Sequence, residues 1–201
     1  MRRSVPWAVA LTLLSIAVAG GWLSEWDQQV TAWLQARRTL PLDALMRAVT
    51  FFGSSPWTLV VVALMSGRWF LRRQRDALVR FLGVGVVGMA IEVVLRLTIA
   101  QWRPDSAAVP GGMDWHARFE LAGFPSGHAF RAAWLYGWWG GWLAQWRARW
   151  SLIAALGCSV LILLVGFSRV YLLRHWMTDV VGSWLVALTV FSAIRVRAHS
   201  T

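Results

Sequence analysis

The sequence contains no lysine and only one cysteine. All 20 of its basic residues are arginine, and with nine acidic residues they give a formal net charge of +11 over 201 residues. A charge of this size can indicate nucleic-acid binding, but the basic stripe that marks a soluble nucleic-acid-binding domain is missing. Cys158 stands alone within an apolar run, so the chain can form neither an internal disulfide bond nor a cysteine-based metal site.

Charged residues of either sign are also scarce. They make up 14% of the chain, against 58% hydrophobic residues, which is too few for a typical soluble domain. The apolar residues form runs of about 17 to 22 residues, long enough to cross the hydrocarbon core as helices. We therefore predict an all-α, polytopic membrane protein, a bundle of six transmembrane helices in one domain of residues 1–201. The predicted spans are residues 6–23, 55–70, 80–100, 128–146, 151–168 and 177–195.

Residues 25–54 carry too many charges to cross a membrane. Apolar residues recur there at helical spacing on both sides of Thr39-Leu40-Pro41. This pattern predicts two short amphipathic helices in the outer interface after the first span, which could form a rim for a lipid entering sideways. The alternative is a plain connector between the first two spans.

Three clusters of basic and histidine residues lie at the ends of predicted spans. In the first, Arg96 and Arg103 are two helical turns apart, so both are expected to project from one helix face, and Pro104 is expected to end that helix. The planar guanidinium group donates paired hydrogen bonds to phosphate oxygens. The alternative is that Arg103 reaches to the membrane interface while Arg96 pairs with Glu92 one turn earlier.

The second cluster, Pro125-Ser126-Gly127-His128, opens the fourth predicted span. The first turn of a helix leaves backbone N–H groups unpaired, and together with the helix dipole they form a potential anion site. His128 can donate a proton to a leaving oxygen near neutral pH. The alternatives are that Ser126 is only a helix N-cap and that His128 is only an interfacial residue.

The third cluster is Ser168-Arg169 followed by His175 and Asp179. His175 and Asp179 are one helical turn apart, so Asp179 can accept a hydrogen bond from one imidazole nitrogen. That contact would fix the tautomer and leave the other nitrogen as a nucleophile. Ser168 and Arg169 add further phosphate donors. The alternative is a helix-end pair without a catalytic role, but an unneeded buried aspartate is costly in a membrane.

Together, the clusters resemble the signature of the type 2 phosphatidic acid phosphatase superfamily. Its pattern is Lys-x6-Arg-Pro, then Pro-Ser-Gly-His, then Ser-Arg-x5-His-x3-Asp. The second and third motifs match in full and with the same spacing, whereas the first departs at Arg96, where the family usually has lysine. The predicted six-span layout and residues 27–54 also look like the bacterial members of the family.

The resemblance implies a two-step phosphoryl transfer that needs neither a metal ion nor another cofactor. His175 would attack phosphorus, Asp179 would orient it, and His128 would protonate the leaving oxygen. The groups expected to hold the phosphoryl oxygens are Arg96, Arg103, Arg169, Ser126 and the Gly127 amide. A transition state with charge spread over those oxygens gains most from fixed cations and donors. The outer carboxylates lack the spacing of a metal cage.

Arginines concentrate at one end of the predicted spans. With a cytoplasmic N-terminus, that end carries the single acid Asp76 and the arginines Arg2, Arg3, Arg68, Arg72, Arg73, Arg75, Arg80, Arg147, Arg149, Arg195 and Arg197. The opposite end holds the acids Glu25, Asp27, Asp43, Asp105, Asp114 and Glu120. The positive-inside rule then places both termini in the cytoplasm of a bacterial inner membrane and all three clusters on the periplasmic or outer face.

This topology requires that the first span is not removed. The alternative is a secretory signal, because Met1-Arg2-Arg3 precedes the first apolar run and Ala17-Val18-Ala19 resembles a cleavage site.

A site at the membrane surface favours a lipid phosphate as substrate. The expected partners are this lipid and the surrounding bilayer, and no nucleic acid. The short outer loop, residues 103–126, leaves little chain for reading an elaborate head group. We favour undecaprenyl diphosphate, followed by phosphatidate or phosphatidylglycerophosphate.

Three other functions use similar residues. A lipid phosphotransferase could have an identical site. A vanadate-dependent haloperoxidase is disfavoured by the short, membrane-spanning chain. Inverted repeats or paired broken helices would favour a phosphate-anion channel or transporter, and the sequence shows neither.

Overall fold

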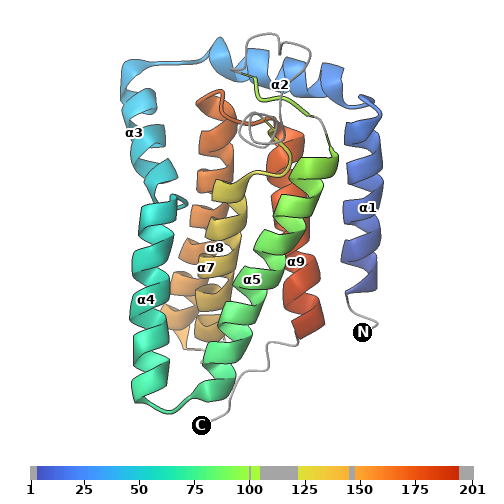
Figure 1. Cartoon of the computed structure of the whole chain (residues 1–201). Helices are drawn as coiled ribbons and strands as arrows, with labels where there is room; N and C mark the ends of the chain where they lie inside the picture. Colours follow the sequence, from blue (N-terminus) through green and yellow to red (C-terminus); the bar gives the residue numbers. More distant parts are fainter. Residues whose placement is uncertain (1–3, 100, 105–121, 145–147, 195–201) are drawn as a thin grey trace.

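The protein is a bundle of long helices crossed at one end by a shorter helix (Figure 1). The computed structural model describes residues 4–99, 101–104, 122–144 and 148–194. The helices are α1 Val5–Ala19, α2 Ser24–Gln35, α3 Leu40–Phe51, α4 Ser55–Leu71, α5 Arg75–Thr98, α7 Gly127–Ala144, α8 Arg149–Tyr171 and α9 Met177–Ile194. Within these residues there is no β-strand, only an isolated bridge between Trp102 and Ala122. The all-α prediction is therefore confirmed.

Multiple membrane spans are present, but the predicted number of six is not confirmed. By length and composition, the described residues contain four candidate spans, Leu40–Leu71, Arg75–Thr98, Arg149–Tyr171 and Met177–Ile194. A fifth arises if α1 and α2, which bend by 88° at their junction, are counted as one broken span. The helix α1 has only 15 residues. The helix α7 is polar for a span, with glycines, a histidine and an arginine, because much of its surface faces other helices rather than lipid.

The two short helices predicted after the first span are present as α2 and α3, and their interfacial position stays a prediction. The chain does divide at Thr39, whose hydroxyl caps α3 by accepting a hydrogen bond from the Leu42 N–H. The helix α2 lies across the end of the bundle, but α3 runs on towards α4 along its side (Figure 1). Ser54 caps α4 in the same way as Thr39 caps α3. By length and composition, α3 and α4 together form a single candidate span, which differs from the prediction of a separate interfacial helix.

The core forms where α7 packs against α4, α5 and α9. The Phe81 ring packs against Trp134 and Trp138, with ring centroids 4.9 and 5.4 Å away, and the Trp134 indole N–H donates to the Phe81 carbonyl at 3.0 Å. At Gly88 an added Cβ would lie only 2.0 Å from the Phe130 ring. This close approach brings together the ends of α5 and α7 that lie nearest α2, where the first two sequence clusters lie.

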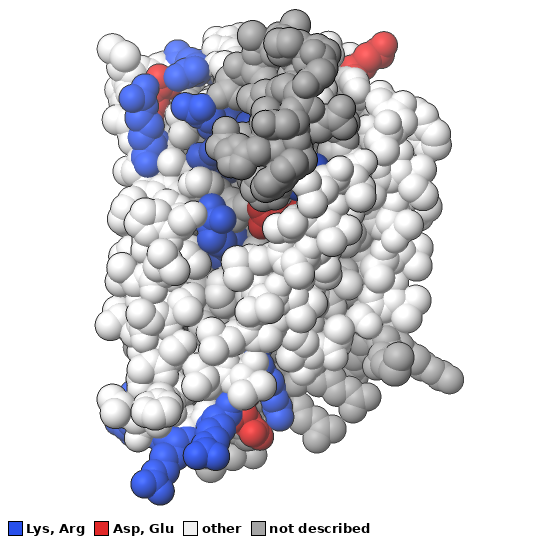
Figure 2. All heavy atoms as spheres, viewed as in Figure 1, with Lys and Arg blue, Asp and Glu red and all other residues white. Residues whose placement is uncertain are grey.

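The two ends of the bundle differ in charge. The helix α1 begins and α9 ends at the end opposite α2 (Figure 1). Arginines gather at that end around the connection of α4 to α5, and a smaller group lies at the corner where α2 meets α3 (Figure 2). The second group consists of Arg37, Arg38 and Arg47, so the end of the bundle near α2 carries basic as well as acidic residues. Outside the described residues lie Arg2, Arg3, Arg147, Arg195, Arg197, Asp105, Asp114 and Glu120.

Candidate active site

His175 and Asp179 form the pair that their spacing predicts. His175 lies in the short connection between α8 and α9, and Asp179 lies in the first turn of α9. The Nδ1 atom of His175 is 3.1 Å from Oδ2 of Asp179, and both side chains are buried. The backbone N–H of Trp176 donates to the same carboxylate oxygen at 2.9 Å. With Nδ1–H directed at the carboxylate, the lone pair of the imidazole stands on Nε2.

Arg169 lies beside this pair, in the last turn of α8. Its carbonyl oxygen accepts hydrogen bonds from the backbone N–H groups of Arg174 and His175, which folds the connection back over the helix end. Its guanidinium Nη1 donates to the Thr50 hydroxyl of α3 at 2.9 Å. The neighbouring Ser168 differs from the prediction. Its buried hydroxyl donates to the Val165 carbonyl of its own helix at 2.6 Å, so it is held away from a phosphate role in this structure.

The Pro125-Ser126-Gly127-His128 turn packs directly against the start of α9. The Ser126 N–H donates to the Asp179 carbonyl at 3.1 Å, and the Ser183 hydroxyl lies 2.7 Å from the Ser126 carbonyl. The Ser126 side chain does not cap α7. Its buried Oγ has no hydrogen-bond partner among the described residues. The second and third clusters are therefore joined through the backbone, and the Ser126 hydroxyl is available to a bound anion.

The first cluster reaches the site by a different route from the predicted one. The helix α5 ends at Thr98, before Arg103 and Pro104, so Arg96 and Arg103 do not share a helix face. Beyond α5 the chain is extended. It is held by an N–H···O bond of 2.6 Å from Gly123 to Gln101 and by the Trp176 indole, which donates to the Trp102 carbonyl at 2.7 Å. Pairing with a distant segment thus ends the helix earlier than Pro104 would.

Arg96 makes the contact that the sequence analysis gave as its alternative. Its Nη2 atom lies 2.7 Å from the Glu92 carboxylate and also donates to the Pro125 carbonyl at 3.0 Å. The Glu92 carboxylate lies directly over Gly127, where an added Cβ would come within 2.7 Å of it. Arg96 therefore joins α5 to the turn that carries His128.

Arg131 is a site residue that the motifs did not include. It lies one turn after His128 on α7, and its Nη2 is 3.2 Å from Nδ1 of His128. Its Nε donates to the Gly53 carbonyl, between α3 and α4, at 2.9 Å. The helical spacing of three residues from His128 was the one sequence signal that could have identified it.

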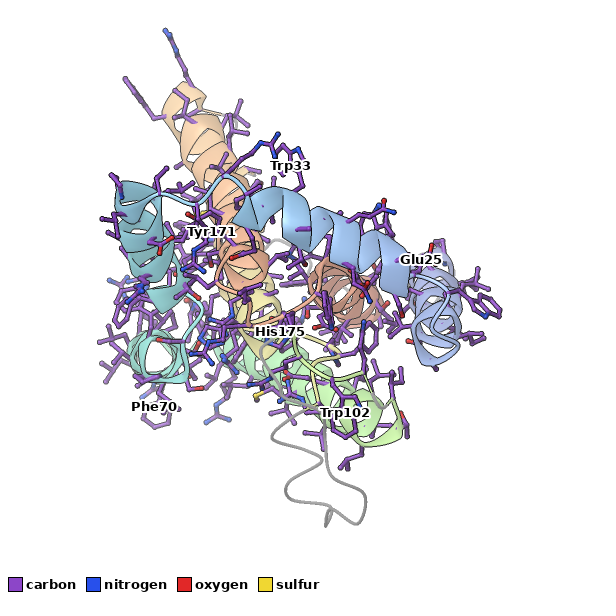
Figure 3. All side chains as sticks on the ribbon, turned by 90° about the horizontal axis from the view of Figure 1, so that it is seen from above. Glu25, Trp33, Phe70, Trp102, Tyr171 and His175 are labelled. Atoms are coloured by element: carbon purple, nitrogen blue, oxygen red, sulfur yellow. The ribbon has the colours of Figure 1, made fainter. Side chains whose placement is uncertain are left out.

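The motif residues converge electrostatically on His175. Burial is the largest effect that lowers the pKa of His175 well below its usual value, followed by the positive charges of Arg169, Arg103 and Arg96, and His128 acts in the same direction. The free imidazole is therefore neutral at physiological pH. Seen from above, His175 lies among the helix ends beside the path of α2, whose ends are marked by Glu25 and Trp33 (Figure 3).

A neutral histidine oriented by a carboxylate, with several guanidinium groups around it, is suited to attack on a phosphoryl group. Across the described parts of the chain, no three histidine, cysteine or carboxylate side chains gather closely enough to hold a metal ion.

Comparison with known proteins identifies the family of the chain. The sequence model of the PAP2 superfamily matches residues 77–199, which include all three motifs. The chain belongs to the PAP2 superfamily. It is similar to phosphatidylglycerophosphatase B of Bacillus subtilis (strain 168), with 29% identity over 158 residues that cover 77% of this chain and 74% of the relative.

A solved structure of a PAP2 enzyme shares the fold. The crystal structure of a transmembrane PAP2-type phosphatidylglycerolphosphate phosphatase from Bacillus subtilis superposes with a TM-score of 0.79 and 26% identity, covering 97% of this chain and 95% of that one. The PAP2 protein described here is accordingly a membrane phosphatase.

Proposed function

We propose that this PAP2 protein hydrolyses the phosphomonoester of a membrane lipid, with phosphatidylglycerophosphate as first candidate, through a phosphohistidine at His175. The observation that carries the proposal is the buried contact of 3.1 Å between His175 and Asp179, surrounded by the arginines of the motifs. This arrangement keeps a neutral nucleophile next to cations that can hold a phosphate.

In the first step, Nε2 of His175 forms a bond to phosphorus as the bond from phosphorus to the lipid oxygen breaks. Asp179 holds the Nδ1–H and stabilises the positive charge that develops on the ring. His128, in its doubly protonated imidazolium form, gives a proton to the leaving lipid oxygen and becomes neutral. In the second step, water attacks phosphorus, His128 takes a proton from that water, and the bond to His175 breaks to release inorganic phosphate.

The phosphoryl oxygens are held by Arg103, Arg169, the Ser126 hydroxyl and the Gly127 amide, with Arg96 as a further candidate. Because these donors and cations already supply the counter-charge, we propose that turnover needs no divalent metal ion. The buried Ser126 Oγ, with no partner among the described residues, supports its place in this set.

The two relatives change the order of the candidate substrates. Both are named for phosphatidylglycerophosphate, which the sequence analysis placed behind undecaprenyl diphosphate. The relatives therefore favour a phosphomonoester of a glycerophospholipid, and undecaprenyl diphosphate becomes the second candidate.

We further propose that all six long helices, α1, α4, α5, α7, α8 and α9, cross a bacterial inner membrane, with both termini in the cytoplasm. Support comes from their side-by-side arrangement and from the arginines at the end opposite α2 (Figures 1 and 2). The site would then face the periplasm, with α2 in the head-group layer.

The substrate is tested with purified protein in detergent and with EDTA present. Release of inorganic phosphate is measured from phosphatidylglycerophosphate, phosphatidate and undecaprenyl diphosphate, with His175→Ala as a control. We expect the highest kcat/KM for phosphatidylglycerophosphate and no turnover by the variant. A preference for undecaprenyl diphosphate would reverse the order. Loss of the lipid phosphate without release of inorganic phosphate would instead indicate a phosphotransferase.

A further inference from the structure

Asp27 is a buried carboxylate outside the three motifs. It lies in α2, the helix that crosses the end of the bundle, and its exposed fraction is 1%. Its neighbour Glu25, also in α2, is exposed. Burying a carboxylate costs several kcal/mol of free energy unless hydrogen-bond donors replace the lost water. The donors around Asp27 therefore indicate which part of the fold its carboxylate stabilises.

The donors to Asp27 come mainly from the first turn of α9. The Thr178 backbone N–H donates to Oδ1 at 3.1 Å, and the Thr178 hydroxyl donates to Oδ2 at 2.5 Å. Gln101 Nε2 lies 3.4 Å from the same Oδ2 and 3.2 Å from the Thr178 hydroxyl. Asp27 therefore acts as an N-terminal cap for α9, supplied from a segment 151 residues earlier in the chain.

The capped turn is the one that carries the orienting carboxylate of the active site. Thr178 immediately precedes Asp179, which contacts His175. Gln101 links Asp27 to a second segment near Asp179, because the Gln101 carbonyl accepts a hydrogen bond from the Gly123 N–H. Gly123 lies close to Asp179, since a Cβ added there would be 2.8 Å from Asp179 Oδ2. Asp27 thus touches both segments that pack around Asp179, through hydrogen bonds with Thr178 and Gln101.

We propose that Asp27 is a positioning residue for the phosphatase reaction. It holds the first turn of α9 so that Asp179 stays in contact with His175, and it fixes α2 against the outer end of the bundle. The inference rests on the proposed function, because it assigns Asp27 to the His175–Asp179 pair. A contact that only stabilised the fold would place no requirement on the rate of phosphoryl transfer.

The test compares Asp27→Asn with Glu25→Gln, an exposed acid of the same helix, in the full-length protein. The asparagine keeps the shape and one acceptor but removes the charge and presents an N–H group to Gln101. We expect kcat to fall roughly tenfold or more with KM changed less than about twofold, because Asp27 does not touch the substrate. Asp27→Glu should recover part of kcat, and Glu25→Gln should behave as wild type.

A second pair of variants tests the route through Thr178. Thr178→Val removes the hydroxyl and keeps the backbone N–H, so it should lower kcat less than Asp27→Asn. The double variant should lose less than the product of the two single effects, because both changes act on one contact. Multiplicative effects would overturn this route.

Thermal unfolding of each variant separates positioning from folding. A lower Tm with full kcat per folded molecule would overturn the inference and leave Asp27 a structural residue. If wild type shows no turnover, or if His175→Ala stays active, the proposed function itself fails. If turnover depends on His175 but Asp27→Asn keeps full kcat, only the role of Asp27 is wrong.

Discussion

His128 and His175 are held in opposite tautomers by their partners. The guanidinium group of Arg131 can only donate hydrogen bonds, so Nδ1 of His128, 3.2 Å from Nη2 of Arg131, must accept, and the ring hydrogen is on Nε2. In His175 the Nδ1 atom faces the acceptor Asp179, so its Nε2 carries a lone pair. In the free enzyme one ring therefore offers a nucleophile, and the other offers an N–H hydrogen bond. His128 acts as the general acid only once its ring carries a second proton.

Arg131→Met should lower kcat because it removes the partner that fixes His128. We expect a loss of about 1.4 kcal/mol in transition-state stabilisation, roughly tenfold in kcat, with a smaller change in KM. Arg131→Lys should recover only part, since an ammonium group lacks the fork that reaches both His128 and the Gly53 carbonyl. Steady-state kinetics on the preferred lipid test this, and an unchanged kcat in the methionine variant would refute it.

Variants can distinguish the two candidate roles of Arg96. If Arg96 also binds the phosphoryl group, Arg96→Ala should cost at least about 2 kcal/mol, roughly thirtyfold in kcat/KM. Arg96→Lys, which restores the usual family residue, should recover only part because the donor positions shift. Both values are obtained from initial rates at low substrate concentration.

The pairing role gives a different result. If Arg96 serves only the contact of 2.7 Å with Glu92, Arg96→Ala should lower Tm and leave kcat/KM almost unchanged. A double variant with Glu92→Gln should then regain most of the stability, because it removes the buried carboxylate that Arg96→Ala leaves without its partner. That outcome would remove Arg96 from the phosphate site.

The pKa of His175 sets the acid side of the pH profile. Burial and the charges of Arg169 and Arg103 hold this pKa well below the usual 6.5, and the neutral ring is the form that attacks phosphorus. A lowered pKa means that protonation begins at lower pH, so kcat/KM should stay level as pH falls through 6.5 and decline only below it. Measurements from about pH 5 to about pH 8 test this. A decline centred at or above 6.5 would contradict it.

The orientation of the site can be tested by cysteine labelling. With Cys158 replaced by alanine, Glu25→Cys at the exposed start of α2 should react with an impermeant thiol reagent in intact spheroplasts. Gln74→Cys, in the exposed connection between α4 and α5, is the matched control and should react only after lysis. The reverse pattern would place the site on the cytoplasmic side.

Local patterns in the sequence predicted much of this structure. Predicted span 177–195 corresponds to Met177–Ile194 and span 55–70 to Ser55–Leu71, because hydrophobic periodicity and cap residues are local signals. The contact of His175 with Asp179 was predicted from a spacing of one helical turn, and it forms although His175 lies in the connection before α9. The span count was less predictable, because a central helix such as α7 can be polar without facing lipid.

Contacts between distant segments could not be predicted. Asp27 and Thr178 are 151 residues apart, and no periodic pattern links them. The early end of α5 depends on pairing of Gln101 with Gly123, which overrides the helix-ending signal of Pro104. The partner of Arg131 at Gly53 is likewise set by how α7 packs on the junction of α3 and α4.

The central claim is that the phosphoryl group passes through His175, and trapping the intermediate tests it most directly. The enzyme is mixed with lipid carrying radioactive phosphate, quenched in alkali within the first turnover, digested and mapped. The account predicts an alkali-stable, acid-labile label on the peptide that contains His175, formed before inorganic phosphate appears and absent from His175→Ala. A label on any other residue, or near-full hydrolysis by His175→Ala, would contradict it.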